Sequence, residues 1–149
     1  MHVVATDPQF KLFAGCAVVL SLQMLFLAAY TAATRSRVKH YLNPEDAKVS
    51  FHDAQLNNGA EHADVARILR AHRNLNESLP LFFSLGLLCL LAGAAPLASE
   101  LCFGAFTVAR LLHSFVYIKG LQPWRTMSYG VGTLALLGMS VLIVLAIVS

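Results

Sequence analysis

The sequence predicts an all-α integral membrane protein that folds as a bundle of four transmembrane helices. Hydrophobic residues make up 57% of its 149 residues, and charged residues only 13%. A soluble domain carries about a quarter charged residues, so the composition argues against a soluble protein. The apolar residues also fall in long continuous runs. The strands of a membrane β-barrel would instead alternate over about ten residues, so the runs favour helices.

Four of these runs are close to the roughly 20 residues that a helix needs to cross a bilayer. They cover residues 12–33, 75–98, 101–118 and 127–148. We expect them to form one domain over residues 1–149. The segment before the first run is weakly charged, because Asp7 balances Lys11, and the run itself is longer than the apolar core of a signal peptide. We therefore expect a retained helix there. Only the third run holds a charge well inside it, Arg110.

Basic residues are distributed unevenly along the chain, and this predicts its orientation. The segments that follow the first and third runs contain Arg35, Arg37, Lys39, Lys48, Arg67, Arg70, Arg73, Lys119 and Arg125. The positive-inside rule places both segments in the cytoplasm and both termini on the opposite side. We expect a multi-pass protein of the endoplasmic reticulum or of a bacterial inner membrane, surrounded by membrane lipids. The net charge of +3 is then a topological bias and indicates no nucleic-acid partner.

The cytoplasmic loop at residues 34–60 is the only sizeable polar region. The sequence that begins with Asn43 and Pro44 predicts a short helix, with Asn43 as its cap and Pro44 at its first position. Residues 57–59, Asn-Asn-Gly, predict a turn. From Glu61 a helical pattern runs without a break into the second span, so this helix should project beyond the bilayer.

The other connections are short. Residues 94–97 must turn the chain between the second and third spans, and residues 119–124 connect the third span to the fourth. Short connections of this kind make consecutive helices antiparallel neighbours. The result is a compact bundle in which the second helix contacts the third.

Two function classes find no support in the sequence. The three cysteines lie far apart in apolar runs, so we expect them to pack as small apolar residues and expect no metal site. The glycine patterns that hold the phosphates of nucleotides are also absent, which disfavours a nucleotide ligand.

Polar residues occupy one face of each of three predicted helices. The second helix carries, at positions i, i+3, i+4 and i+7, Arg70, Arg73, Asn74 and Glu77. The third carries Arg110, His113 and Tyr117, and the fourth begins with Arg125, Thr126 and Tyr129. The third helix ends on the side where the second and fourth begin, so these sets should converge. Arg35, at the end of the first helix, can join them.

Each of these residues also has a simpler interpretation. Arg37 and Lys39 are best explained as basic residues that fix the topology. His113 alone would fit a hydrogen-bonded residue of a bundle, and Tyr117 an aromatic residue at the membrane interface. Arg110 lies about two turns inside the third span and needs an anionic partner, for which Glu77 is the candidate. The coincidence on three helices favours a functional site.

The residue types of this set indicate the chemistry of a ligand. Arginine side chains bind carboxylates or phosphates through two parallel hydrogen bonds. A small peptide with two carboxylates and an amine fits this set better than a nucleotide does. The arginines would bind its carboxylates, and Glu77 would bind its ammonium group.

Three motifs resemble the MAPEG superfamily of membrane proteins in eicosanoid and glutathione metabolism. They are Asn43-Pro-Glu-Asp-Ala47, Arg70-Ala-His-Arg-Asn74 followed by Glu77, and Arg110-x-x-His113-x-x-x-Tyr117. The likeness is strongest to its prostaglandin E synthase (type 1) and microsomal glutathione transferase branches. It implies a homotrimer with glutathione bound between subunits. The implied contacts of glutathione are Arg35, Arg70, Arg73, Asn74, Glu77, His113, Tyr117, Arg125 and Tyr129.

The resemblance also implies an activity. Arg125 would lie beside the glutathione sulfur, with Thr126 and Asp46 as further catalytic residues. We expect an enzyme of the glutathione transferase or peroxidase type, which activates the thiol for attack on a lipophilic electrophile that arrives from the bilayer. A glutathione-dependent isomerase of the prostaglandin E synthase type is the alternative. A non-catalytic lipid-binding scaffold is a second alternative.

Overall fold

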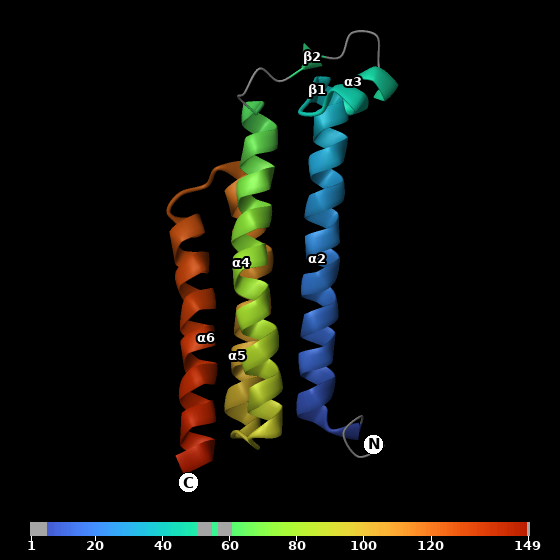
Figure 1. Cartoon of the computed structure of the whole chain (residues 1–149). Coiled ribbons are helices and arrows are strands. Elements are labelled where there is room, and N and C mark those ends of the chain that lie inside the picture. The colour runs from blue at the N-terminus through green and yellow to red at the C-terminus, as the bar shows by residue number, and fades with distance from the viewer. Residues whose placement is uncertain (1–5, 51–54, 57–60, 149) are drawn as a thin grey trace.

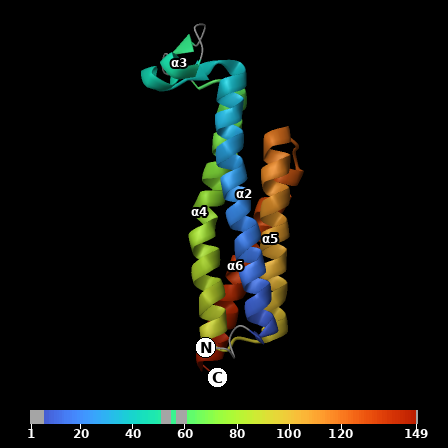
Figure 2. The same cartoon turned by 90° about the vertical axis from the view of Figure 1, so that its right-hand side faces the viewer.

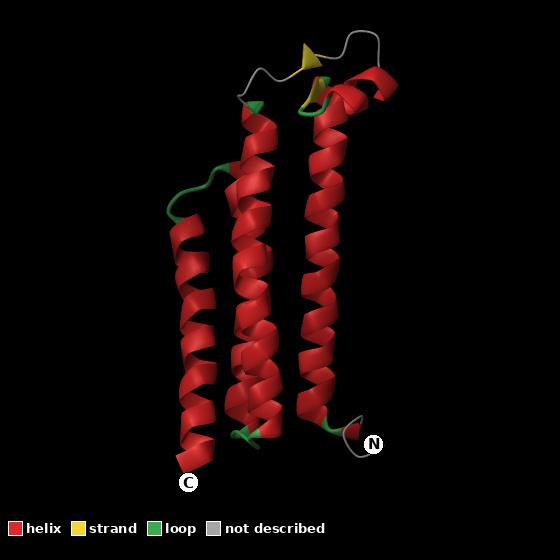
Figure 3. Cartoon of the chain, viewed as in Figure 1, coloured by secondary structure: helices red, strands yellow, loops and turns green. Residues whose placement is uncertain are grey.

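The computed structural model describes residues 6–50, 55–56 and 61–148, and its long helices lie side by side in one bundle (Figures 1 and 3). These helices are α2 (Pro8–Val38), α4 (Ala63–Leu91), α5 (Pro96–Lys119) and α6 (Trp124–Val148). Each is long and apolar enough to cross a membrane. The predicted all-α bundle of four membrane-spanning helices is therefore confirmed, and the chain is an integral multi-pass membrane protein.

Helix α2 extends beyond the predicted span at both ends. Asp7 caps its start, where its Oδ1 accepts a hydrogen bond from the backbone N–H of Gln9 at 3.0 Å, and Pro8 takes the first helical position. The helix stops at Lys39, which adopts a left-handed conformation with φ 53°. The prediction counted apolar residues only and so missed the polar turns at the two ends.

The turn between α4 and α5 lies earlier in the chain than predicted. Helix α4 stops at Leu91, not near residue 98, and Pro96 already begins α5. The physical cause is Gly93, whose φ of +65° lies in the left-handed region that ends a helix. The small apolar residues on both sides of the turn hid this boundary, because they continue the hydrophobic pattern.

The polar loop contains more structure than the sequence indicated. Helix α3 (Pro44–Ser50) forms as predicted. The Asn43 side chain donates from Nδ2 to Oδ2 of Asp46 at 3.0 Å, so it bonds to a carboxylate and not to the backbone. A two-residue parallel pair of strands, β1 (His40–Tyr41) and β2 (Gln55–Leu56), was not predicted. The predicted turn at residues 57–59 lies outside the described residues.

Aromatic rings fill the centre of the bundle. Phe82 of α4 stacks on Phe106 of α5 at 4.6 Å between ring centroids, and Phe13 of α2 contacts Phe82 and Phe103. Gly86 lets α2 approach, because a Cβ at this position would collide with the Phe13 ring. Close packing of this kind holds helices together in lipid, where burial of apolar surface gives little driving force.

Both chain ends lie at one end of the bundle. At the opposite end are α3, the two strands and the connection from α5 to α6, and we call this the loop end (Figure 1). Helix α2 packs against α4 and α5, and α6 packs against the same two helices. The view in Figure 2 shows α2 beside α5 along the length of the bundle. The polar residues singled out above therefore lie toward the loop end.

Candidate functional site

Arg110 joins three helices near the loop end. It is 2% exposed, and its Nη1 donates a hydrogen bond to Oδ1 of Asn74 on α4 at 2.9 Å. Its guanidinium also lies over the ring of Phe106 at 5.2 Å and over the ring of Tyr129 on α6 at 5.4 Å. The prediction that Glu77 pairs with Arg110 is wrong for a single chain: Asn74 takes that place, and no ion pair to Arg110 occurs among the described residues.

A glycine makes room for this arginine. A Cβ at Gly132 of α6 would lie 3.2 Å from the Arg110 Nε, so a larger residue would press on the guanidinium. That Nε is buried and has no hydrogen-bond partner among the residues that the structure describes. Arg110 is therefore a buried cation held by one amide and two aromatic rings, with a donor left over.

His113 lies one turn further along α5 and is 4% exposed. Its Nδ1 is 3.1 Å from the backbone oxygen of Arg125 and 3.2 Å from the Ser128 hydroxyl. A carbonyl oxygen only accepts hydrogen bonds, so this contact requires a proton on Nδ1. In the neutral ring Nε2 is then an acceptor, and it too is buried, with no partner in the described part of the chain. His113 thus fixes the start of α6 and leaves one acceptor unused.

Arg125 is held by its neighbours in a defined place. Its guanidinium lies 4.9 Å from the centre of the Tyr117 ring. The side-chain amide of Gln122 lies between Arg125 and Thr126. In the orientation that satisfies both, its oxygen accepts from Nε and Nη2 of Arg125 at 3.1 and 2.7 Å, and its nitrogen donates to the Thr126 hydroxyl at 3.2 Å. A guanidinium and a hydroxyl are thus organised side by side at the start of a helix.

Ring contacts connect the two arginines. The His113 ring is 5.6 Å from the Tyr117 ring and 6.0 Å from the Tyr129 ring. A continuous series of contacts therefore runs from Asn74 through Arg110, Tyr129, His113 and Tyr117 to Arg125, and we call these six residues the polar cluster. The expected convergence of α4, α5 and α6 is observed for them.

Beside the polar cluster, residues of α4, α5 and α6 line a cavity of about 160 Å³. It is lined by Asn74, Glu77, Ser78, Leu81, Arg110, Tyr129, Thr133 and Leu136. Glu77 is exposed, so its carboxylate stays accessible to a ligand. A carboxylate and a guanidinium thus face one small cavity without forming an ion pair with each other.

Other expected site residues lie apart from the polar cluster. Arg70 and Arg73 are exposed on α4 and form no ion pair with any described residue. Arg35 of α2 donates to Glu61 at 3.1 Å. Asp46 is in α3, which packs against the two strands beyond the end of α2, on the other side of α4 from α6 (Figure 1). Within one chain, Arg35 and Asp46 do not reach the polar cluster.

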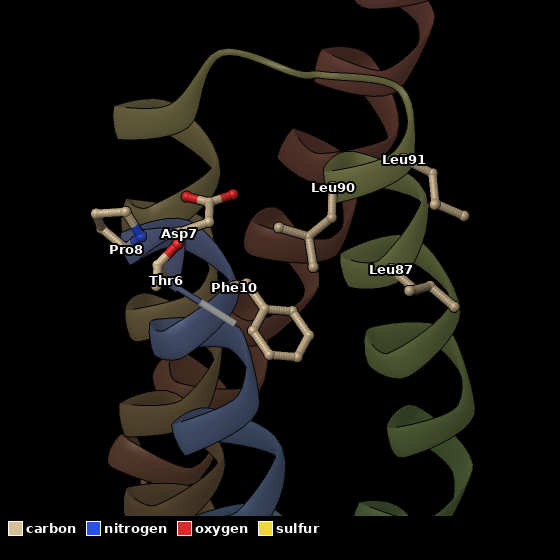
Figure 4. Close-up of a pocket in the computed structure, with 7 residues that line it drawn as sticks. All are labelled: Thr6, Asp7, Pro8, Phe10, Leu87, Leu90 and Leu91. Carbon is tan, nitrogen blue, oxygen red and sulfur yellow. The ribbon is translucent and has the colours of Figure 1, made fainter. Parts of the chain in front are cut away.

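A larger cavity, of about 560 Å³, opens at the opposite end of the bundle between α2 and α4. Figure 4 shows its lining, which includes Phe10, Leu87, Leu90 and Leu91. Among the described residues that line it, the one charged side chain is that of Asp7, which caps α2. The described lining of this cavity is thus mostly apolar, unlike the polar lining of the smaller cavity beside Arg110.

Sequence reasoning missed Gln122, Ser128 and Gly132. Arg125, Ser128, Tyr129 and Gly132 follow the same i, i+3, i+4, i+7 spacing that identified the face on α4. The signal was therefore present in the sequence. Serine and glycine are common in membrane helices, however, and neither stands out as arginine does.

The fold and the polar cluster define a class: a multi-pass membrane protein with an arginine-rich polar site built between three helices of its bundle. Comparison with known proteins agrees. The family model described as "MAPEG family" matches residues 13–145. A prostaglandin E synthase of Equus caballus is 34% identical over 133 residues, which are 89% of this chain and 85% of that protein. Microsomal glutathione S-transferase 1 of Homo sapiens is 35% identical over 132 residues, 87% and 84% of the two chains. The chain belongs to the MAPEG family.

Proposed function

We propose that the protein is a glutathione-dependent membrane enzyme of the transferase or peroxidase type, which acts on a lipophilic electrophile. The observation that carries this proposal is the buried Arg110, which faces the same cavity as Glu77 and whose Nε has no hydrogen-bond partner among the described residues. The names of the relatives, prostaglandin E synthase and microsomal glutathione S-transferase, support it. The exposed Arg70 and Arg73 supply further cations for carboxylates, and Glu77 supplies an acceptor for an ammonium group.

Glutathione supplies a thiol, which has to be ionised before it can attack. A free thiol with a pKa near 8.5 is only a few per cent thiolate at neutral pH. Lowering that pKa by two units takes about 2.7 kcal/mol of preferential stabilisation of the thiolate. Arg125 and the Thr126 hydroxyl, arranged through Gln122 at the start of α6, are donors of the kind that supply such an energy.

The wider proposal places Arg35, Arg70, Arg73, Asn74, Glu77, His113, Tyr117, Arg125 and Tyr129 around glutathione. Asp46 would assist Arg125. Asp46 and Arg35 can take part only if α3 and α2 of another subunit approach the polar cluster. The proposed site, on the cytoplasmic side, therefore requires an oligomer, because Arg35 and Asp46 would reach it from another subunit.

A homotrimer would complete the site. The cavity of about 160 Å³ is smaller than the roughly 300–1,000 Å³ typical of small-molecule sites. The exposed side chains of Arg70, Arg73 and Glu77 form no ion pair with any residue that the structure describes. We expect the mass measured in mild detergent, after subtraction of bound detergent, to equal three chains. An active monomer under the same conditions would contradict the trimer.

An isomerase is the second candidate, because several prostaglandin E synthases are about as similar as the transferase. The fate of glutathione separates the two. A transferase consumes glutathione and releases a conjugate, whereas an isomerase acting on an endoperoxide regenerates it. Purified protein should be assayed with an aromatic halide and with a lipid endoperoxide. Glutathione binding without turnover of either substrate would instead favour a scaffold.

Replacing Arg73 or Glu77 by alanine should weaken glutathione binding and leave the fold intact. Each residue is exposed and forms no ion pair with a described residue, so its loss should change stability little. Hydrogen bonds to charged groups contribute about 1.5–3 kcal/mol, so we expect an affinity about 10- to 100-fold lower. Titration calorimetry in detergent measures this. Lys11→Ala, an exposed cation at the other end of the bundle, is the matched control. Unchanged affinity in both variants would remove these residues from the site.

A further inference from the structure

A cavity that a ligand could enter lies on a different face of the bundle, between α2 and α5. A groove of about 290 Å³ lies there, lined by Gln23, Phe26, Leu27, Tyr30, Leu111, Ser114, Phe115, Ile118 and Lys119. Except at its two ends, its lining is apolar or aromatic. We call it the α2–α5 groove. Figure 2 shows these two helices side by side, with the loop end at the top.

Gln23 closes the inner end of this groove and keeps its shape. Its Nε2 donates to the backbone oxygen of Arg110 at 2.9 Å and to the Ser114 hydroxyl at 2.7 Å. Both bonds tie α2 to α5 at one depth. Phe26 and Tyr30, one turn apart on α2, stack at 5.8 Å between centroids and form one wall. The groove is therefore braced by hydrogen bonds and ring contacts.

At the loop end the groove continues into a polar pocket of about 200 Å³. Tyr30, Ile118 and Lys119 line both cavities, and the pocket adds Arg37, Asp64, Arg67 and Ile68. The Arg67 guanidinium lies against Gly120, where a Cβ would be 2.9 Å from Nη1. We call Arg37, Arg67 and Lys119 the basic triad.

The basic triad gives this pocket an excess of positive charge, because its lining contains three cations and one acid. None of its members forms an ion pair with a described residue. The one acid of the pocket, Asp64, lies 3.9 Å from Nδ1 of His62 and is largely exposed. Three cations from the ends of three different helices thus surround this pocket, and their charge favours an anionic ligand.

The length of the combined site corresponds to one leaflet of a bilayer. Gln23 and Arg37 are 14 residues apart on α2, which is about 21 Å along a helix. Half of a bilayer with its headgroups is about 20–22 Å thick. The apolar part would therefore lie at the depth of an acyl chain, and the basic triad at the depth of the headgroups.

We propose that the α2–α5 groove and the basic triad together bind one anionic phospholipid of the leaflet at the loop end. Its phosphate lies among Arg37, Arg67 and Lys119, and one acyl chain lies along α2 and α5 toward Gln23. The basic segments predict that this end faces the cytoplasm, where the leaflet is rich in anionic lipid. The proposal does not depend on glutathione, because none of these residues belongs to the polar cluster.

Removal of two cations tests the headgroup contact. The full chain is purified in mild detergent, and phosphatidylglycerol is titrated while native mass spectrometry measures the lipid bound per chain. Each cation near a headgroup strengthens binding about fivefold, so Arg37→Gln combined with Lys119→Gln should weaken it about 30-fold. Lys11→Gln with Lys48→Gln removes the same charge from two exposed sites outside the pocket and should have little effect. Equal affinity in the two double variants would overturn the proposal.

Blocking the groove tests the acyl chain separately. Leu111→Trp would fill the α2–α5 groove, and Leu112→Trp, on the neighbouring exposed position that does not line it, is the matched control. Only the first should lose phosphatidylglycerol. Phosphatidylcholine should bind more weakly than phosphatidylglycerol to wild type, and inorganic phosphate should not compete. Competition by phosphate would indicate a free-anion site, and a changed oligomer mass in Leu111→Trp would indicate a subunit contact; either result would overturn the proposal.

Discussion

Replacing Arg125 by alanine is expected to lower the turnover of glutathione conjugation about 10²- to 10³-fold, with only a small loss of glutathione affinity. The size follows from removal of one preorganised donor that stabilises a developing or resident anion. The Tyr117 ring and the Gln122 amide hold the Arg125 side chain in place at the start of α6. A helix start adds a further preference for negative charge.

The pH dependence of the rate should show in which direction Arg125 shifts the pKa of bound glutathione. The guanidinium favours the thiolate, so its removal should raise the pKa of bound glutathione and shift the rising limb of the pH–rate profile to higher pH. The ultraviolet absorbance of the thiolate reports the same pKa independently. Arg125→Lys keeps the charge without the planar fork, so it should restore part of the rate. A variant with the wild-type profile and rate would make Arg125 a topology residue and direct attention to Thr126 or Tyr129.

Much of the polar cluster could be predicted from periodicity and topology. Helical spacing placed Arg110, His113 and Tyr117 on one face of α5, and the short connections brought α4 and α6 alongside it. Helical spacing and short connections depend on residues that are close together in the chain, so both can be inferred from the sequence. The observed contacts of Arg110 with Tyr129, and of His113 with Arg125, follow from them.

The partner of Arg110 could not be predicted in the same way. Asn74 and Glu77 lie one turn apart on α4, so both face α5, and the choice between them depends on the rotation of α4 and the reach of each side chain. The amide at position 74 lies deeper in the contact, while Glu77 stays at its edge. Arg35 and Asp46 pose a different problem, because the proposed site receives them from another subunit, and helical spacing within one chain does not specify a contact between chains.

Replacing Arg110 by methionine should leave the ligand-free protein at least as stable as wild type and should lower glutathione affinity by more than tenfold. A buried cation loses several kcal/mol of hydration, and Arg110 recovers only part of it from one amide and two aromatic rings. Methionine removes that cost and still fills the space beside Gly132. Asn74 is only partly buried and lines the cavity, so water can replace the lost donor at its side-chain oxygen.

Thermal unfolding with and without glutathione separates the two effects. A ligand that binds only the folded state raises Tm, so wild type should be stabilised by glutathione and Arg110→Met should not. Arg110→Lys retains the buried charge and is the matched control: its Tm without ligand should fall below that of Arg110→Met, and it should keep a partial response to glutathione. A methionine variant with a lowered Tm and a full response to glutathione would show that Arg110 holds the helices together and binds no ligand. A raised Tm with no response would show that the membrane bundle retains this cation, at a cost to its own stability, for the anion that it binds.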